Sequence, residues 1–459
     1  MPISEGLRTS LNQIRETLVQ NNKVYAEQID EISPNSDISV LSAPLFDDED
    51  LMNDFIKVLV KRIIYTQVVN YKLFNNPLKV LEGSQMPLGS IGQEIHINPA
   101  KGRKFNVNDF AGLLAKYEAD VKVQYMHLNS DIQYPLTITR AKLKDAFTSW
   151  ANLEEFVNGL SNSLYNGAYI DRYNFTKGLM ASAYRDNTVQ MQVVENPASS
   201  KELAEAFVTK ARELFLNFKE PTADYNAWKK VGGYGYDVIT WTDPEDIVFL
   251  IRNDVMAFVD VNVLAQAFNM DKAKLLGNII PIKDFTERDT KNNVVVDGSN
   301  IYAMMCDKKW FRIKNQETTM DEFYNANNRT WQLYLNDVNM FQYSLFCNAM
   351  MFVTKEPEVT ITGLDVSQKE VTVNKGDKIV VNVSTTPAQA NTPEITATSN
   401  ASGTATASIT GRAITITGVA QGNTTVTVKA GNVQTDITVN VTDTATASTM
   451  SVKQTTSTK

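Results

Sequence analysis

The 459-residue sequence has little of the chemistry on which most enzymes depend. It contains two histidines, His96 and His127, and two cysteines, Cys306 and Cys347, which stand far apart. Histidine is the usual general base and metal ligand near neutral pH. No paired Cys-x-x-Cys, HExxH motif, phosphate-binding loop or nucleophile elbow occurs. We therefore expect that the protein is not an enzyme. We also expect no catalytic residues, no cofactor and no metal centre.

The remaining candidate sites are weak. The acidic run Asp47–Asp48–Glu49–Asp50 lacks the spacing of a calcium loop, so solvation of a linker is the favoured interpretation. Gly233–Tyr234–Gly235 lacks the third glycine and the preceding strand of a dinucleotide fingerprint, which indicates a loop. Neither histidine has a carboxylate or cysteine neighbour at ligand spacing, and we interpret both as packing or surface residues.

Membrane-spanning segments, a secretion signal and a broad basic surface are also missing from the pattern of the sequence. No run of 18 apolar residues occurs, so we expect no membrane span. The N-terminal stretch lacks the apolar core of a secretion signal. A net charge of −8 argues against a broad basic surface that grips nucleic acid or an anionic membrane. The two separated cysteines fit synthesis in a reducing cytosol.

Aromatic residues disappear after Phe352. From residue 357 to 442, Thr, Ser and Asn alternate with Val and Ile, and glycines recur at short intervals. This pattern predicts an all-β sandwich. Residues 443–459 are rich in Thr and Ser, and we expect them to be disordered.

The longest helical pattern runs from Thr137 to Asp186. Its apolar residues recur at three- and four-residue steps, namely Leu143, Phe147, Trp150, Leu153, Phe156, Val157, Leu160 and Leu164. A helix of roughly 25 to 45 residues would be a rod of about 40 to 65 Å, against which smaller elements pack.

Shorter elements are expected on either side. Residues 4–30 predict a helix with a narrow apolar seam, suited to pairing with another helix or to an arm on a neighbour. Residues 34–50 predict a polar linker, and 51–74 an apolar segment that is helical at its start. Prolines and glycines over 75–92 predict an extended, turning chain. Residues 90–136 predict a long segment of strand and loop, which is typical of a functional loop.

After the long helix the expected elements alternate. A strand over 188–194 precedes a helix that begins at the capping box Ser199–Glu202. A buried strand over 246–251, a helix over 253–269 and a strand over 278–282 follow. The last elements predicted are a hairpin over 294–313 and an apolar strand over 341–353, which makes the fold class of the core α+β.

Several blocks, taken in order, resemble the major capsid proteins of small short-tailed phages of Gram-positive bacteria, the phi-twenty-nine-like group. They are NNPLK (75–79), QMPLG (85–89), AFTSWANLEEF (146–156), SLYN (163–166), VLAQAFNM (263–270), LGN (276–278) and DKKWF (307–311), followed by a bacterial immunoglobulin-like repeat.

The resemblance implies the tailed-phage (Hong Kong 97-like) capsid fold with a C-terminal Ig-like sandwich. Residues 1–50, which match the family poorly, would be an N-terminal helical arm and linker, and 51–355 the capsid core domain. Within the core, the extended loop would lie near 90–136, the spine helix near 137–186 and the axial domain near 195–285. Residues 357–442 would be the Ig-like domain.

The function implied is a self-assembling major capsid subunit of an icosahedral-symmetry head that encloses double-stranded DNA. The expected partners are further copies in hexamers and pentamers, a scaffolding protein, a portal at one vertex, and DNA contacted weakly without sequence specificity. The Ig-like domain would project from the surface, where it touches host cell-wall carbohydrate or only adds mass. The protein would be located in the virion and assembled in the host cytoplasm.

The alternative is a bacterial cell-surface adhesion or carbohydrate-binding protein, because Ig-like repeats occur in such proteins. The missing secretion signal, the missing anchor and the single repeat argue against it.

Overall fold

The computed structural model describes residues 3–21, 28–65, 74–87, 91–103, 116–232, 237–259 and 278–443. The chain divides into two compact units. Unit 1 comprises residues 1–181, 276–299 and 308–344, and unit 2 comprises 182–275, 300–307 and 345–459. The predicted features at 233–235 and 263–270 and the predicted tail from 444 onward lie outside the described residues.

Helix α7 (Trp150–Arg185) is the longest element of the described chain and has 36 residues, or about 54 Å. The predicted stripe is confirmed, because Trp150, Leu153, Leu160 and Leu164 are buried. The predicted start at Thr137 is wrong. Residues 137–139 belong to a strand, and a separate short helix, α6 (Arg140–Ala146), precedes α7.

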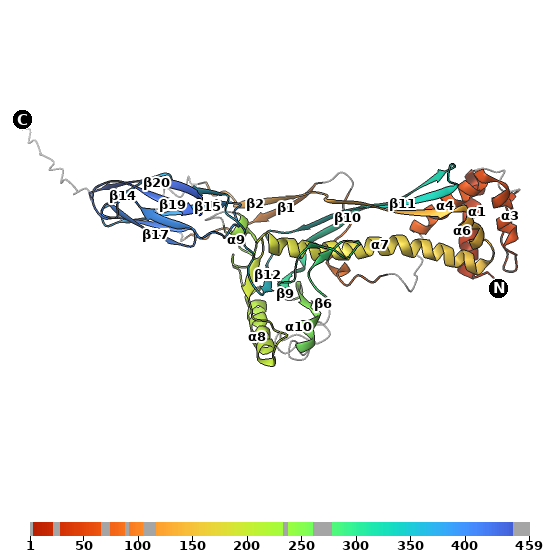
Figure 1. The fold of residues 1–459 in the computed structure, drawn as a ribbon, viewed down its shortest axis with the longest axis horizontal. Coiled ribbons are helices and arrows are strands. Elements are labelled where there is room, and N and C mark those ends of the chain that lie inside the picture. Colours follow the sequence, from red (N-terminus) through yellow and green to blue (C-terminus); the bar gives the residue numbers. More distant parts are fainter. Residues whose placement is uncertain are drawn as a thin grey trace, which may run out of the picture. The chain divides into compact units, whose positions relative to one another are not determined.

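A three-stranded antiparallel sheet lies along α7 in unit 1 (Figure 1). Its order is β10 (Phe311–Asn325), β11 (Thr330–Tyr343) and β3 (Ser130–Thr139). The β10–β11 hairpin has strands of 15 and 14 residues, about three times the usual strand length. The pairing of β3 with β11 runs from Ser130↔Asn339 to Thr139↔Thr330, which explains why residues 137–139 do not join the helix.

A helical cluster packs at one end of α7 (Figure 1). It contains α1 (Glu5–Asn21), α3 (Ser39–Asp47), α4 (Glu49–Tyr65) and α6. The seam of α1 is confirmed, since Leu11, Ile14 and Leu18 are buried, and they join the core of their own chain. The predicted polar linker at 34–50 is wrong. It contains α3, whose Leu41 and Leu45 are buried in the same core.

The described part of unit 1 also contains an irregular segment and two ribbons. Residues 74–87 form an irregular segment with one 3₁₀ turn, η1 (Lys79–Leu81), as the prolines predict. Strand β1 (Gly92–Ile97) then pairs antiparallel with β2 (Val121–Met126), which we call the β1–β2 ribbon. Strand β6 (Ile279–Ile282) precedes a second ribbon of β7 (Glu287–Arg288) and β8 (Val294–Val296), the β7–β8 ribbon.

Unit 2 begins with a mixed sheet in which β4 (Gln190–Val193), β12 (Ala349–Val353), β9 (Ile301–Asp307) and β5 (Ile247–Arg252) lie side by side in that order. Helix α8 (Lys201–Asn217) packs Phe207 against Phe352 of β12, with ring centroids 5.1 Å apart. Its N-cap is Ser200, whose hydroxyl accepts from the Leu203 amide, and not the predicted Ser199. The described residues of this part also form two short helices, α9 (Trp228–Val231) and α10 (Asn253–Phe258).

The hairpin predicted over 294–313 is wrong. Strand β9 pairs with β5 on one edge and with β12 on the other, and all seven of its residues are buried. Strand β10 belongs instead to the long hairpin of unit 1. The strand predicted over 341–353 is divided between the end of β11 and β12. The buried strand predicted over 246–251 is confirmed. The 253–269 helix is confirmed only at its start, because 260–277 lie outside the described residues.

The C-terminal sandwich is confirmed as two four-stranded sheets. One contains β13 (Gly363–Val366), β15 (Lys378–Thr386), β18 (Ala413–Gly418) and β17 (Ala405–Thr410). The other contains β14 (Glu370–Asn374), β20 (Val433–Thr442), β19 (Gly422–Ala430) and β16 (Thr396–Ser399). The core between them consists of Val, Ile and Ala, as the alternating pattern predicts.

Candidate functional site

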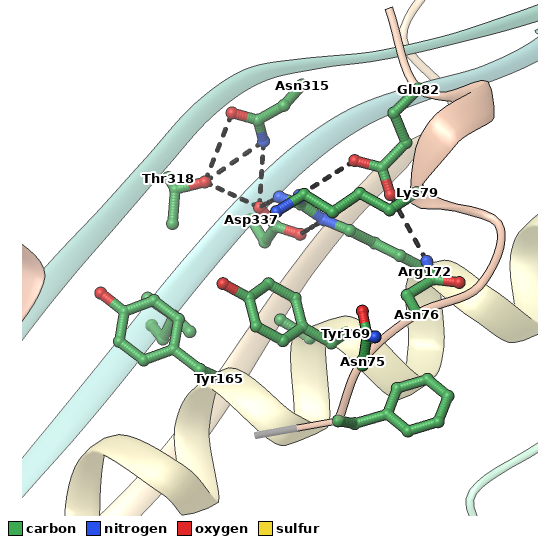
Figure 2. Close-up of a pocket in the computed structure, with 13 residues that line it drawn as sticks. Asn75, Asn76, Lys79, Glu82, Tyr165, Tyr169, Arg172, Asn315, Thr318 and Asp337 are labelled. Atoms are coloured by element: carbon green, nitrogen blue, oxygen red, sulfur yellow. Dashed lines mark hydrogen bonds and ion pairs between the residues drawn. The ribbon is translucent and has the colours of Figure 1, made fainter. Parts of the chain in front are cut away.

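A buried ion-pair network joins α7 to the long sheet of unit 1 (Figure 2). The Arg172 guanidinium on α7 donates from Nε to Asp337 Oδ2 at 2.9 Å and through a second nitrogen to Oδ1. The Asp337 side chain on β11 is only 2% exposed, and that of Arg172 is 15% exposed. Two parallel bonds of this kind fix both the distance and the orientation of the helix on the sheet.

Neutral donors surround the same carboxylate. Asn315 Nδ2 donates to Asp337 Oδ1 at 3.0 Å, the Thr318 hydroxyl donates at 2.9 Å, and Asn339 Nδ2 donates to Oδ2 at 2.7 Å. Asn315 and Thr318 are three residues apart, so in a regular strand they would face opposite sides. An irregularity between Asn315 and Glu317 inserts one residue into β10 and brings both side chains to Asp337.

The same irregularity anchors the segment that precedes the β1–β2 ribbon. Gln316 Nε2 donates to the Pro87 carbonyl at 3.2 Å, and Gln85 Nε2 donates to the Gln316 carbonyl at 3.0 Å. Glu82 lies 3.9 Å from Arg172. Burial raises the pKa of the Glu82 carboxyl, while the charge of Arg172 acts in the opposite direction. The block NNPLK therefore begins a segment that is tied to both α7 and β10.

A pocket of about 330 Å³ opens beside this network. Figure 2 shows Tyr165 and Tyr169 of α7 on one side, and Asn75 and Asn76 on another. Arg172 and Asp337 are already paired within it, so its charges are largely compensated. We interpret the pocket and network as a joint between structural elements, because the Arg172–Asp337 pair at its wall connects α7 to β11.

A second buried carboxyl lies next to Arg172 on α7. Asp171 accepts a hydrogen bond from the Tyr134 hydroxyl of β3 at 3.0 Å. Burial raises the pKa of the Asp171 carboxyl and of the Tyr134 phenol, and the neighbouring charge of Asp171 raises the latter further. Helix α7 is thus attached to β3 and β11 by adjacent residues.

The β1–β2 ribbon has an unusual distribution of polarity. Its inner face is polar and anchored, because Glu94 accepts from the Arg312 guanidinium and from the Ser344 hydroxyl at 2.9 Å. Gln124 Nε2 donates to the Tyr343 carbonyl at 2.8 Å. The outer face is apolar and open to solvent, with Ile95 55%, Ile97 61%, Val121 45% and Tyr125 69% exposed.

Those of the residues singled out in the sequence that the structure describes have separate surroundings. His96 lies on the inner face of β1, 3.3 Å from Asn98, and His127 is exposed beside Gln342. Asp48 caps α4 by accepting from the Asp50 and Leu51 amides, which explains part of the acidic run. Cys306 is a buried free thiol, and burial raises its pKa.

No three His, Cys, Asp or Glu side chains among the described residues gather closely enough to hold a metal ion. None of the helices described has the length and apolarity needed to cross a membrane. The Arg172–Asp337 pair and the open ribbon face were not predicted from the sequence, because each depends on contacts between residues far apart in the chain.

Comparison with known proteins covers both parts of the chain. Residues 11–353 match the family model described as Phi29-like phage major capsid protein, and residues 360–452 match the bacterial Ig-like domain (group 2). The expected poor match of residues 1–50 is wrong from residue 11 onward. The major capsid protein of Bacillus phage B103 is 29% identical over 369 residues, which cover 80% of this chain and 77% of that protein. The major capsid protein of Bacillus phage GA-1 is 30% identical over 377 residues, 81% of this chain and 74% of that protein.

A solved structure supports the fold. The capsid structure of Staphylococcus phage Andhra matches with a TM-score of 0.50 and 15% identity, over 63% of this chain and 87% of that one. The predicted α+β class and tailed-phage capsid fold are confirmed. The adhesion alternative accounts for the Ig-like domain alone and leaves the match over residues 11–353 unexplained. The chain belongs to the Phi29-like phage major capsid protein family and is a structural component of the virion that forms the phage head.

Proposed function

We propose that the β1–β2 ribbon is the main attachment of each subunit to its neighbour in the shell. The supporting observation is the apolar outer face of Ile95, Ile97, Val121 and Tyr125, which the described residues of the same chain leave open. Contiguous exposed apolar surface marks an interaction site. A two-stranded ribbon is marginally stable alone, so contact with a neighbour would stabilise it as well as the shell. This role corresponds to the extended loop expected over 90–136.

Capsid relatives imply self-assembly into a shell. A ribbon that reaches a different surface of the next copy makes a heterologous contact, and such contacts close into rings when the rotation is suitable. We place this chain in hexamers and pentamers built by these contacts. One contact of modest size gives modest affinity, and many contacts per subunit give a stable container.

The other partners follow from the same role. A scaffolding protein would set the curvature during assembly in the host cytoplasm, and a portal would replace subunits at one vertex. The packaged DNA would be contacted weakly and without sequence specificity, because the net charge of −8 does not favour a tight grip on phosphates.

We place the Ig-like domain on the outer surface of the shell. It contains no Phe, Tyr or Trp, so it offers no aromatic platform of the kind on which ligand rings commonly stack. Contact with the host cell wall would therefore depend on hydroxyl and amide groups. Deleting residues 357–459 separates host contact from added mass. Particles that assemble and adsorb to cells as the full chain does would end the host-contact proposal.

The ribbon proposal is tested by the single change Ile95→Glu. The matched control is Val380→Glu, because Val380 is also 55% exposed and lies on strand β15 of the Ig-like domain. We expect Ile95→Glu subunits to remain folded and to stay unassembled by sedimentation and electron microscopy, while the control assembles. Normal particles from Ile95→Glu would contradict the proposal.

A further inference from the structure

We propose that the surface that receives the β1–β2 ribbon is the β7–β8 ribbon of a second copy of this chain, with Val294 and Val295 at the centre of the contact. This inference rests on the proposed function, and it adds the acceptor. Both ribbons belong to unit 1, so every copy presents a donor face and an acceptor face.

The acceptor is recognised by two adjacent apolar residues that are both exposed. Val294 is 53% exposed and Val295 is 56% exposed. Successive side chains of a strand point to opposite faces, so a strand packed on its own body buries one of each such pair. Only the third valine of the strand, Val296, is buried. Strand β8 therefore projects two valines into solvent from both of its faces.

The base of this ribbon is held firmly. Phe285 is fully buried, and the Gly298 amide donates to the Thr286 hydroxyl at 3.2 Å. A side chain at Gly298 would come within 2.6 Å of the Phe285 backbone, so the two segments are in close contact. Lys177 of α7 pairs with Asp284 at 3.1 Å. A ribbon fixed in this way loses little conformational entropy when a partner covers its tip.

Few other exposed apolar residues could receive the ribbon. In the described part of unit 2 they are Val193, Leu216, Trp241, Phe258, Val380 and Val419, each in a different segment. In the described part of unit 1, the large apolar residues exposed away from the β1–β2 ribbon and its adjoining loop are Val80, Ile170 and Phe323, each alone in its own element, and the pair Val294–Val295. An apolar face of several side chains needs an apolar counterpart if both are to leave water. The valine pair is the largest counterpart among these.

The charges beside the two faces are complementary. Residues 98–103 and 116–122, next to the donor face, contain four basic and two acidic side chains. Residues 284–297 contain four acidic and two basic side chains, and one of the acidic side chains, Asp284, is paired with Lys177. Opposite net charges at the two ends of a contact favour its correct register and disfavour donor-to-donor pairing.

The test is cross-linking between two different variants. Ile95→Cys chains and Val294→Cys chains are assembled together and treated with a short bismaleimide, and the products are separated under denaturing conditions. We expect covalent dimers in mixed shells. Neither variant assembled alone should give them, nor should wild-type shells, which control for the native cysteines.

The outcomes distinguish the two proposals. Mixed shells without dimers, in which the cysteine at position 95 is nevertheless protected from labelling, would overturn the acceptor and leave the ribbon proposal standing. A cysteine at position 95 that labels fully in intact shells would overturn both. A second variant keeps the inference testable should cysteines hinder assembly: Val294→Asp should block assembly, and Val380→Asp should not. Normal assembly of Val294→Asp would contradict the acceptor.

Discussion

Removal of the Arg172 charge tests the network that holds α7 on the sheet. The change Arg172→Met keeps the length of the aliphatic stem and leaves Asp337 buried without its cation. Loss of one partner of a buried ion pair costs about 3–5 kcal/mol. Three neutral donors remain, from Asn315 at 3.0 Å, Thr318 at 2.9 Å and Asn339 at 2.7 Å. We therefore expect the lower end, about 3 kcal/mol, or roughly a hundredfold loss of protection against opening.

Hydrogen exchange read by mass spectrometry measures this locally, which matters because a chain of two units need not unfold in one step. Peptides from residues 311–343 should lose protection, and peptides from the Ig-like strands over 363–442 should serve as an unchanged internal reference. The control is Arg185→Met, on the same helix. Its ion pair with Asp186 has side chains 59% and 41% exposed, so a loss below about 1 kcal/mol is expected.

A double variant separates charge from packing. Arg172→Met combined with Asp337→Asn removes both charges and should be less destabilised than Arg172→Met alone, because no unpaired buried charge remains. The reasoning is refuted if Arg172→Met changes exchange no more than Arg185→Met does, or if the double variant is destabilised at least as much as Arg172→Met alone.

Three further predictions address individual residues and segments. Because the pKa of the Glu82 carboxyl is raised in the folded state, its ionisation opposes folding at neutral pH, and the protein gains stability as the pH falls through that pKa. Glu82→Gln should abolish this gain, which is measured as hydrogen exchange of residues 74–87 at pH 7 and pH 5. An equal gain in both proteins would contradict the prediction. Gly298→Ala should destabilise the β7–β8 ribbon by about 1–3 kcal/mol, because the new methyl group would meet the Phe285 backbone. Gly159→Ala in α7 should stabilise the protein by about 0.5–1 kcal/mol in thermal unfolding, because no atom lies within 4 Å of the added methyl group. Changes of the same sign in both variants would refute this prediction. Removal of residues 357–459 should leave shell assembly intact by electron microscopy, because the family match to the capsid core ends at residue 353; failure to assemble would assign the Ig-like domain a part in building the shell.

Local periodicity predicted the elements that are buried on one clear face. The stripe from Trp150 to Leu164 gave α7, and the alternation after residue 357 gave the Ig-like sandwich. In both cases the signal lies within neighbouring residues, so no distant part of the chain is needed to interpret it.

Long-range pairing explains the errors. Residues 137–139 continue a helical pattern, but their register with β11 holds them in β3. The short helix α3 was not predicted, because polar residues surround it in the sequence and it contains Pro44. Its buried Leu41 and Leu45 contact a core assembled from distant segments. Strand β9 is buried between β5 and β12, which are separated from it by tens of residues.

The polar network was beyond sequence reasoning for a related reason. Arg172 and Asp337 are 165 residues apart in the sequence. Asn315 and Thr318 both reach Asp337 because one residue is inserted into β10. The apolar outer face of the β1–β2 ribbon is visible as alternation in the sequence, but the contacts of Glu94 and Gln124 with distant residues identify which face is turned outward.

Thiol labelling of Ile95→Cys in intact shells and in dissociated subunits tests the account most directly. Ile95 is 55% exposed in the single chain, so the thiol should label rapidly in free subunits and slowly once a neighbour covers it, with buried Cys306 unreactive in both. Equal labelling in shells and free subunits would show that no copy covers this face.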